Sequence, residues 1–358
     1  MLTDTDAAHD DTMSDDMLRA AVRRLAAGHD LTADEAGGAF DVVMSGGATS
    51  AQVAALLMGL RVKGETPSEV AGAARALRRA MIRLDADAPA DLVDTCGTGG
   101  GGVPTFNIST AAALVAAACG VRIAKHGNRS FTSRSGSADL LESLGVRIDV
   151  TPTEMSAILK ETGIVFMFAP LMHPAMRHVG PVRRELAIPT VMNMIGPLAN
   201  PASAGRQVIG VADRARLDLI AAALHELGTQ FALVVHGEPG MDEISPLGIT
   251  HVRELRAGAA VREWTIDPST LGLGTLLASD LAGGEPADNA SIVRQVLEGV
   301  GTPAAEGAVV LNAAAALYVH RDGGDYAAMV AEVRQSLRNG AAGDVLARLV
   351  AASATRAR

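Results

Sequence analysis

The first part of the chain has the hydrophobic pattern of a group of helices. Across residues 17–86, apolar positions recur at helical spacing between polar starts and glycine stops, and no run alternates as a strand would. Thr32 and Thr66 stand where helices begin, and Ser45-Gly46-Gly47 ends one of them. We therefore expect a small all-α domain over this range.

After residue 86 the pattern changes to short β-branched runs that alternate with alanine-rich helical runs, which is typical of βαβ units around a buried sheet. The fold class we expect is α/β, with a mainly parallel central sheet flanked by helices over residues 87–180 and 202–358. Residues 181–201 are dense in proline and lack a clear strand, so we expect this segment to return to the helical domain. The predicted strands are Leu92–Asp94, Val121–Ala124, Val146–Val150, Ile164–Phe168, Gln207–Val211, Phe231–Val235 and a pair near Thr250 and Trp264. The predicted helices are Ile108–Cys119, Ala138–Leu144, Arg214–Leu227, Ala290–Leu297 and Ala304–Tyr318.

Composition narrows the class of protein. With 358 residues, 48% hydrophobic and 20% charged, the chain is neither a disordered polymer nor a coiled coil. The 3% of aromatic residues argues against a base-stacking nucleic-acid platform. The only two cysteines, Cys96 and Cys119, exclude a disulfide framework and a cysteine-based zinc cluster, and they suit a reducing compartment.

The negative charge is concentrated at the start of the chain. Residues 1–16 hold six aspartates and no Lys or Arg, and removing these six carboxylates from the formal net charge of −9 leaves −3. We interpret these residues as an acidic disordered tail. The tail is unlike a signal peptide, and no apolar stretch reaches the ~20 residues of a membrane helix. We expect a soluble cytoplasmic protein without a membrane or nucleic-acid partner.

The strongest local motif is a glycine-rich loop between a predicted strand and a predicted helix. Asp94-Thr95-Cys96-Gly97-Thr98 leads into the glycines 99–102, and Asn107-Ile108-Ser109-Thr110 opens the helix with Asn107 as its expected N-cap. Glycines let backbone N–H groups converge on an anion, and a helix N-terminus adds unpaired donors. The motif is neither a P-loop nor the usual dinucleotide fingerprint. We favour a phosphate site over a flexible surface loop because ligands bind at such strand ends.

Two further motifs follow neighbouring strands. Lys125-His126-Gly127-Asn128-Arg129 places a cation and several donors after a strand, and beside the glycine loop this favours phosphate binding over a solvated lysine. Asp242 and Glu243 follow another strand and suit Mg²⁺, although such a pair usually faces solvent. The basic run within residues 172–185 is either a helix face or a site for a carboxylate held by arginine.

Taken in order, these motifs resemble the anthranilate phosphoribosyltransferases of the nucleoside-phosphorylase-like phosphoribosyltransferase family. The resemblance covers nearly the whole chain after the tail. Its remaining parts are Arg61-Val62-Lys63-Gly64-Glu65-Thr66, His173-Pro174-Ala175-Met176 and Asn193-Met194-Ile195-Gly196-Pro197-Leu198-Ala199-Asn200-Pro201.

The resemblance implies transfer of a 5-phosphoribosyl group from phosphoribosyl diphosphate (PRPP) to the amine of anthranilate, with release of diphosphate, in tryptophan biosynthesis. It implies a homodimer formed through the helical parts and two Mg²⁺ ions per subunit, held by Ser109, Asp242 and Glu243. Arg183 would face the anthranilate carboxylate, with Gly97 and Asn128 beside it. The residues implied for PRPP are Gly97, Gly100, Gly101, Thr105, Asn107, Ser109, Thr110, Lys125, Asn128, Ser133 and Ser137, and Lys125, Asp242 and Glu243 are those implied for catalysis.

One position departs from the family pattern. The family loop usually reads Gly-Thr-Gly-Gly-Asp, and its fifth position is Gly101 here. Loss of this carboxylate reduces repulsion toward a diphosphate and removes a potential metal contact. We hypothesise retained activity with an altered Mg²⁺ dependence.

Two alternatives stay open at this point. A pyrimidine nucleoside phosphorylase of the same fold would use phosphate in place of diphosphate chemistry, and residues 193–201 with the Asp242–Glu243 pair favour PRPP instead. A non-catalytic relative that binds nucleic acid is disfavoured by the acidic balance, although Gly101 is compatible with a degenerate site.

Overall fold

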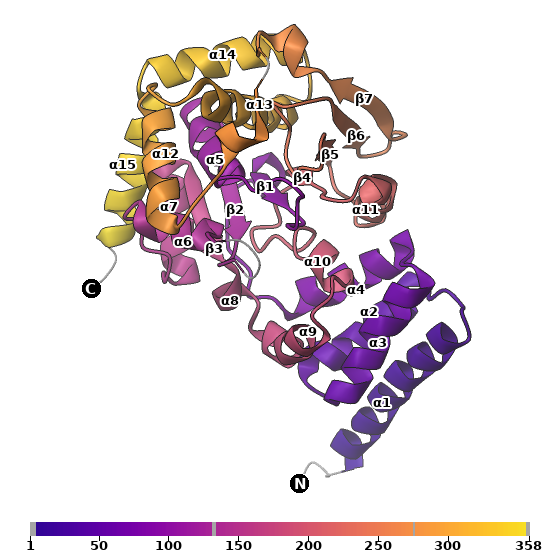
Figure 1. The fold of residues 1–358 in the computed structure, drawn as a ribbon. Coiled ribbons are helices and arrows are strands. Elements are labelled where there is room, and N and C mark those ends of the chain that lie inside the picture. The colour runs from indigo at the N-terminus through magenta and orange to yellow at the C-terminus, as the bar shows by residue number, and fades with distance from the viewer. Residues whose placement is uncertain (1–4, 131–133, 275, 356–358) are drawn as a thin grey trace. The chain divides into compact units, whose positions relative to one another are not determined.

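The structure, a computed structural model, describes residues 5–130, 134–274 and 276–355 (Figure 1). The chain forms two compact units. The helical unit contains the residues up to Ile82 together with Met172–Asn200 and Ala222–Gly228, and the α/β unit contains Arg83–Leu171, Pro201–Ala221 and the residues from Thr229 onward.

The α/β unit is built on a seven-stranded sheet with the order β3-β2-β1-β4-β5-β6-β7. The first five strands in this order are parallel, and β6 and β7 extend the sheet as an antiparallel pair. The strands are β1 (Val93–Gly97), β2 (Ile123–Gly127), β3 (Ile164–Phe168), β4 (Arg206–Gly210), β5 (Phe231–Gly237), β6 (Thr250–Arg256) and β7 (Arg262–Ile266).

The strand order places a switch point at β1. The chain runs from β1 outward to β2 and β3 and then returns to β4 on the other side of β1. At such a reversal the loops after the two strands diverge and leave room for a ligand at the carboxyl ends. The glycine-rich loop follows β1 directly, so the fold places it at this position.

Two apolar helices form the centre of the core. Helix α13 contacts α5 as well as β1, β4 and β5, and the residues of α13 are almost all buried. A helix that is apolar on all sides is stable only when it is covered on all sides. The helices of this unit are α5 (Ile108–Ala118), α6 (Ser137–Ser143), α7 (Pro152–Thr162), α12 (Pro286–Leu297), α13 (Pro303–His320), α14 (Tyr326–Arg338) and α15 (Ala341–Ala354). Helices α8 (Ala169–Met172) and α11 (Leu217–Glu226) contribute residues to both units.

One predicted strand is wrong. Residues Val146–Val150 alternate between buried and more exposed positions but lie outside all seven strands of the described sheet. The backbone N–H of Arg147 donates to Ser353 Oγ on α15 instead of to a neighbouring strand. The alternation therefore reflects packing of an extended segment, and pattern alone does not distinguish the two cases.

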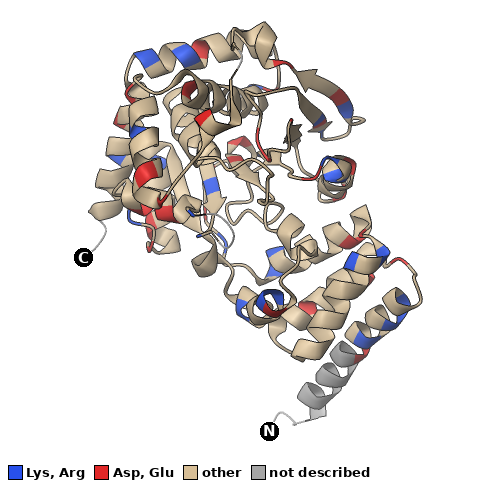
Figure 2. Cartoon of the chain, viewed as in Figure 1, with Lys and Arg blue, Asp and Glu red and all other residues tan. Residues whose placement is uncertain are grey.

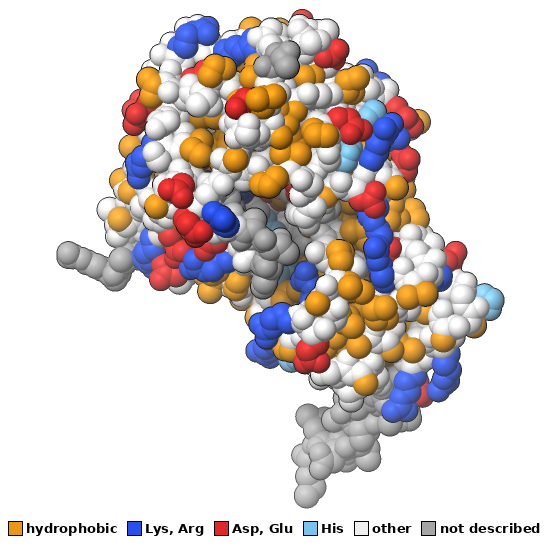
Figure 3. All heavy atoms as spheres, in the orientation of Figure 1, with side chains coloured by type: hydrophobic (Ala, Val, Ile, Leu, Met, Phe, Trp, Pro, Cys, Tyr) orange, Lys and Arg blue, Asp and Glu red, His pale blue; other side chains and the backbone are white. Residues whose placement is uncertain are grey.

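The surface of the described residues carries mixed charge. Figure 2 shows acidic and basic residues on the helices and loops around the sheet. On the face drawn in Figure 3, Lys and Arg stand among acidic and hydrophobic side chains. Cys96 and Cys119 are not joined in a disulfide. Among the described residues, no helix has the length and apolarity to cross a membrane.

Helices α2, α3 and α4 of the helical unit each begin with a capping box. Thr32, Thr49 and Thr66 each accept a backbone N–H from the residue three positions on, whose side chain accepts in return. The helix that follows Thr32 ends at Gly46, which is left-handed with φ 85°. The helices of this unit are α1 (Thr5–Ala26), α2 (Ala33–Ser45), α3 (Ser50–Lys63), α4 (Pro67–Ala80), α9 (Gly180–Leu186) and α10 (Val191–Ile195).

The interpretation of residues 1–16 as a disordered tail differs from the structure. Helix α1 is continuous from Thr5, while residues 1–4 lie outside the described residues.

The buried carboxylate of Glu69 links several segments of the helical unit through hydrogen bonds and an ion pair. Glu69 is fully buried, and its two oxygens accept the backbone N–H groups of Leu31 at 2.9 Å and Thr66 at 2.8 Å. The ammonium of Lys63 lies 3.0 Å from the same carboxylate and 2.7 Å from Asp30. Glu69 thus joins the start of α4, the end of α3 and the loop before α2.

Replacing Glu69 with Ala should cost about 3 kcal/mol of unfolding free energy, because it leaves the N–H groups of Leu31 and Thr66 without their acceptor and removes one of the two carboxylates that pair with the Lys63 ammonium. The matched control is Asp41→Ala, which removes an exposed ion pair with Arg79 and should cost less than about 1 kcal/mol. Urea unfolding of both variants checks this, and equal losses would contradict the central role of Glu69.

Candidate active site

The glycine-rich loop is bonded to the segment that follows β5. Its Gly99 and Gly100 have φ values of 70° and 81°, which favour glycine. The N–H of Gly99 donates to Asp242 Oδ2 at 2.8 Å, and the N–H of Gly102 donates to the carbonyl of Gly240 at 2.7 Å. The loop after β1 and the segment after β5 therefore form one surface.

This arrangement requires the chain to approach itself closely. A Cβ added at Gly210, the last residue of β4, would overlap the main-chain carbonyl of Asp242. A Cβ at Gly97, the last residue of β1, would lie 2.6 Å from Asp242 Oδ2. Glycine at both strand ends is what lets the Asp242 segment lie directly on the sheet.

Asp242 and Glu243 turn their carboxylates toward backbone donors. Glu243 Oε1 accepts the N–H of Ser109, in the first turn of α5, at 3.2 Å. Burial raises the pKa of both carboxyls, and the neighbouring charge of Asp242 raises that of Glu243 further. The N–H groups of Gly99 and Ser109 oppose these pKa shifts but do not cancel them.

Lys125 is buried near Glu243. Only 3% of the residue is exposed, and Nζ donates to the Thr95 carbonyl at 2.5 Å and to Ser109 Oγ at 3.4 Å. Burial lowers the pKa of Lys125, while Asp94 and Glu243 act against that shift. The ammonium therefore sits at the base of the α5 N-terminus and is not the solvated loop lysine of the simpler interpretation.

The sequence predicts Asn107 as the N-cap of α5, but its side chain makes no capping hydrogen bond. Its amide instead joins two distant segments: Nδ2 donates to the Ser135 carbonyl at 2.9 Å, and Oδ1 accepts from Ser135 Oγ at 3.1 Å and from Asn289 Nδ2 at 2.9 Å. Asn289, on α12, was missed because a lone asparagine in a helix belongs to no recognisable motif.

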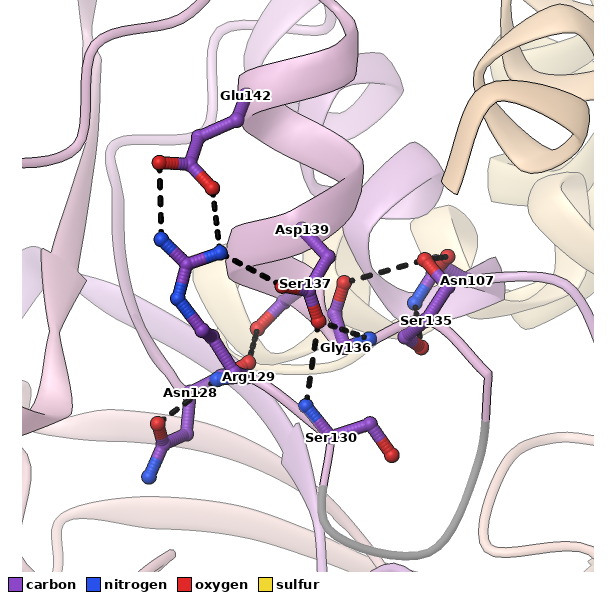
Figure 4. A network of polar contacts seen from close by, with 9 residues as sticks. All are labelled: Asn107, Asn128, Arg129, Ser130, Ser135, Gly136, Ser137, Asp139 and Glu142. Atoms are coloured by element: carbon purple, nitrogen blue, oxygen red, sulfur yellow. Dashed lines mark hydrogen bonds and ion pairs between the residues drawn. The ribbon is translucent and has the colours of Figure 1, made fainter. Parts of the chain in front are cut away.

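The segment after β2 is fixed to α6 by an ion-pair network (Figure 4). Arg129 reaches both Asp139 at 2.7 Å and Glu142 at 2.5 Å, and the other oxygen of Asp139 accepts the N–H groups of Ser130 and Gly136. Ser137 Oγ donates to the Asn128 carbonyl at 3.2 Å. The network holds both ends of the loop that carries the expected phosphate donors. Sequence reasoning assigned no such role to Arg129, Asp139 or Glu142.

The structure brings most of the expected residues to one edge of the α/β unit. Thr110 differs from the other expected residues in its side chain: the hydroxyl is buried and has no hydrogen-bond partner among the described residues. Ser133 lies outside the described residues. Those at the carboxyl ends of β1, β2 and β5 or in the segments that follow are Gly97, Gly100, Gly101, Thr105, Asn107, Ser109, Lys125, Asn128, Ser137, Asp242 and Glu243.

Arg183 belongs to the helical unit, on α9. The residue is partly buried, and its guanidinium makes no ion pair or hydrogen bond with the described residues. Burial lowers its pKa, although an arginine stays charged. An unpaired, partly desolvated guanidinium is suited to hold a planar carboxylate.

The carboxylate pair fits a magnesium ion. Two adjacent carboxyls with raised pKa values, supported by backbone donors and a buried ammonium, carry negative charge that a divalent cation would offset. Among the described residues there is no cluster of three His, Cys, Asp or Glu that would form a full protein cage. Mg²⁺ needs only one or two carboxylates when water and phosphate supply the rest.

The raised pKa values of Asp242 and Glu243 predict a loss of unfolding free energy as the pH rises. A carboxyl with a raised pKa contributes stability below its unfolded value near ~4 and loses it as pH rises through the folded value. In EDTA, the double variant Asp242→Asn/Glu243→Gln should therefore melt higher than the wild type at pH 8, and the difference should shrink toward pH 4.

Glu332→Gln serves as the control of opposite sign. The ion pair with Arg321 lowers the pKa of Glu332, so its small contribution is lost as pH falls. A constant difference between the double variant and the wild type across this pH range would show that the buried carboxylates carry no such cost.

Comparison with known proteins supports one family. The profile of the glycosyl transferase family a/b domain matches residues 89–343, and that of its helical bundle domain matches residues 19–81. The anthranilate phosphoribosyltransferase of Roseiflexus sp. (strain RS-1) is 48% identical over 336 residues, which are 94% of this chain and 98% of that protein. That of Rubrobacter xylanophilus is 49% identical over 337 residues, again 94% and 98% of the two chains.

Comparison with solved structures supports the same family. The crystal structure of anthranilate phosphoribosyltransferase from Thermus thermophilus is 42% identical, with a TM-score of 0.87 over 93% of this chain and 99% of that one. The enzyme from Saccharomyces cerevisiae in complex with PRPP and Mg is 27% identical, with a TM-score of 0.86 over 94% and 98%. With both domains matched and near-complete coverage, the chain belongs to the anthranilate phosphoribosyltransferase family.

Proposed function

We propose that this phosphoribosyltransferase moves the 5-phosphoribosyl group of PRPP to the amine of anthranilate, giving N-(5-phosphoribosyl)anthranilate and diphosphate in tryptophan biosynthesis. The observation that carries the proposal is the joining of the glycine-rich loop, the α5 N-terminus and the Asp242–Glu243 pair at the switch point of the sheet. The relatives named above support the choice of substrates.

PRPP is a polyanion, and the proposed site supplies donors from the main chain. In the glycine-rich loop, the N–H groups of Gly100 and Gly101 have no acceptor among the described residues and are the proposed main-chain donors, since those of Gly99 and Gly102 already donate to Asp242 and Gly240. Asn128 adds a side-chain amide, and the hydroxyls of Thr105 and Ser137 would turn toward PRPP from their present partners, Glu243 and the Asn128 carbonyl. Because Asn107 is already bonded to Ser135 and Asn289, its proposed contribution is to hold the loop segments in place.

Asp242, Glu243 and Ser109 are the proposed magnesium ligands, with two ions per subunit. When bound, Mg²⁺ supplies positive charge that stabilises the departing diphosphate. Lys125 contributes a positive charge near Glu243 and keeps the α5 N-terminus in place through Ser109.

The reaction needs no protein nucleophile. The anomeric carbon develops oxocarbenium character as the C–O bond to diphosphate breaks, and the aromatic amine, unprotonated near neutral pH, attacks from the opposite face. The new C–N bond leaves a positive charge on the nitrogen, which releases one proton to diphosphate or water. Positioning and electrostatics therefore account for catalysis. Arg183 is proposed to hold the anthranilate carboxylate, with Gly97 and Asn128 completing its site.

The assembly and location are proposed on the same family basis. We expect a homodimer through the helical parts and a cytoplasmic enzyme. Two cysteines that form no disulfide are compatible with a reducing compartment.

The direct test follows the fluorescence of anthranilate in the presence of PRPP and Mg²⁺. The expected result is a loss of anthranilate fluorescence that requires the enzyme and both additions. A constant signal with the purified, folded chain would overturn the proposal.

Replacing Arg183 with Ala should raise the KM for anthranilate about tenfold or more while changing the KM for PRPP little, because only the carboxylate contact is lost. The matched control is Arg184→Ala, one residue along α9 and exposed. Steady-state kinetics with each substrate varied distinguishes the two. Equal rises in both KM values for Arg183→Ala would contradict its assignment.

Restoring a carboxylate at Gly101 should lower the Mg²⁺ concentration for half-maximal rate roughly three- to tenfold, because Mg²⁺ affinity follows ligand charge. A Cβ at this position would lie 3.0 Å from Asp242 Oδ1. Gly102→Asp is the control, since a Cβ there meets only the Gly240 carbonyl at 3.8 Å. Identical Mg²⁺ profiles for Gly101→Asp and the wild type would disprove the expected effect.

A further inference from the structure

Asn312 makes an unusual contact for a residue in the middle of a buried helix. It lies on α13, is 6% exposed, and has Leu311 and Ala313 on its two sides. Its side-chain Oδ1 accepts the N–H of Ile244 at 2.9 Å, and Nδ2 donates to the carbonyl of Ile244 at 2.9 Å. The second Nδ2 hydrogen goes to the Ala308 carbonyl on the same helix, also at 2.9 Å. Both donor positions of the amide are thus used.

The partner of this contact is the residue that follows the carboxylate pair. Ile244 comes directly after Asp242 and Glu243, in the segment between the end of β5 and the start of β6. No ladder of the described sheet includes Ile244, so its buried peptide groups need a partner from elsewhere. The Asn312 amide supplies the same donor and acceptor that a neighbouring strand would supply.

The segment is therefore held on both sides of the carboxylates. Before them, Gly237 and Met241 exchange backbone hydrogen bonds in an isolated bridge. After them, Asn312 holds Ile244, and the N–H of Ser245 donates to Thr250 Oγ1 at 2.9 Å. A loop held at both ends fixes the direction of the side chains between them.

The space around Asn312 leaves little room for a water molecule that could replace its hydrogen bonds to Ile244. Together with Ser109, Asp242 and Glu243 it lines a cavity of about 10 Å³. This volume is near the lower limit for a single water molecule. If the amide is removed, water cannot reproduce both hydrogen bonds to Ile244 without a shift of the main chain.

We propose that Asn312 is a positioning residue for the Asp242–Glu243 pair, acting through the peptide groups of Ile244 to set the carboxylates for the Mg²⁺–diphosphate end of PRPP. The inference rests on the proposed function and extends it to a helix to which no substrate contact has been assigned. Partners of this kind, one step behind a metal site, change metal affinity about 10- to 100-fold when removed.

The test compares two variants that each remove a buried hydrogen bond to α13. Asn312→Leu removes the contact with Ile244 and keeps the number of side-chain heavy atoms. Tyr326→Phe is the matched control, because the Tyr326 hydroxyl donates to the carbonyl of Leu311, next to Asn312, at 2.7 Å without touching the carboxylate segment. Thermal unfolding measures the loss of stability in each variant. Calorimetric titration with PRPP at a series of Mg²⁺ concentrations measures the metal requirement independently of turnover.

We expect Asn312→Leu to raise the Mg²⁺ concentration needed for half-maximal PRPP affinity and rate about tenfold or more, with an unchanged KM for anthranilate. Tyr326→Phe should lower the melting temperature while keeping the Mg²⁺ requirement within about twofold of the wild type. Should Asn312→Leu not fold, Asn312→Ser, with a shorter hydroxyl side chain, should show the same shift.

Equal Mg²⁺ requirements in the Asn312 variant and Tyr326→Phe would overturn the inference, as would an equal rise in the KM for anthranilate. A wild type that binds PRPP with Mg²⁺ but leaves anthranilate unconsumed would contradict the proposed function alone, because the calorimetric comparison would still test Asn312.

Discussion

The close approach of the main chain around Asp242 to the ends of β1 and β4 is the constraint on which the rest of the site depends. This approach is possible only because Gly97 and Gly210 lack a Cβ. It brings the Asp242 carboxylate within reach of the Gly99 N–H and the Glu243 carboxylate within reach of the Ser109 N–H. The glycine loop, the first turn of α5 and the acidic pair are thus one structure and not three separate motifs.

The buried ionisable groups of the site also lower the stability of the fold. Two carboxyls with raised pKa values lie near one lysine with a lowered pKa, so burial disfavours the charged form of all three groups. An arrangement of this kind is expected where a ligand with its own charges completes the balance.

The sequence was sufficient for the fold class and for the motifs, and its limits have physical causes. The predicted strand Ile164–Phe168 coincides with β3 because a buried parallel strand reads as a continuous apolar run. Val146–Val150 has the hydrophobic pattern of a strand, but Arg147 in this segment donates its N–H to Ser353 on α15. The pattern indicates which side chains are buried and does not indicate the hydrogen-bond partners of the main chain. The inward direction of Lys125 and the roles of Asn289 and Asn312 depend on contacts between residues 30 to 182 positions apart, which no local pattern records.

The parallel strand order has a consequence for how the site comes into being. β1 and β4 pair although a long stretch of chain separates them, so their pairing requires closure of a large loop, and folds rich in such contacts form slowly. The acidic pair acquires Gly99 and Ser109 as neighbours only when β4, with β5 beside it, has joined β1. Partly folded chains that lack this pairing leave both carboxylates in water, and the electrostatic penalty therefore arises when the pairing forms. A cation and a phosphate ester that bind the finished site would draw this step toward the native state by mass action.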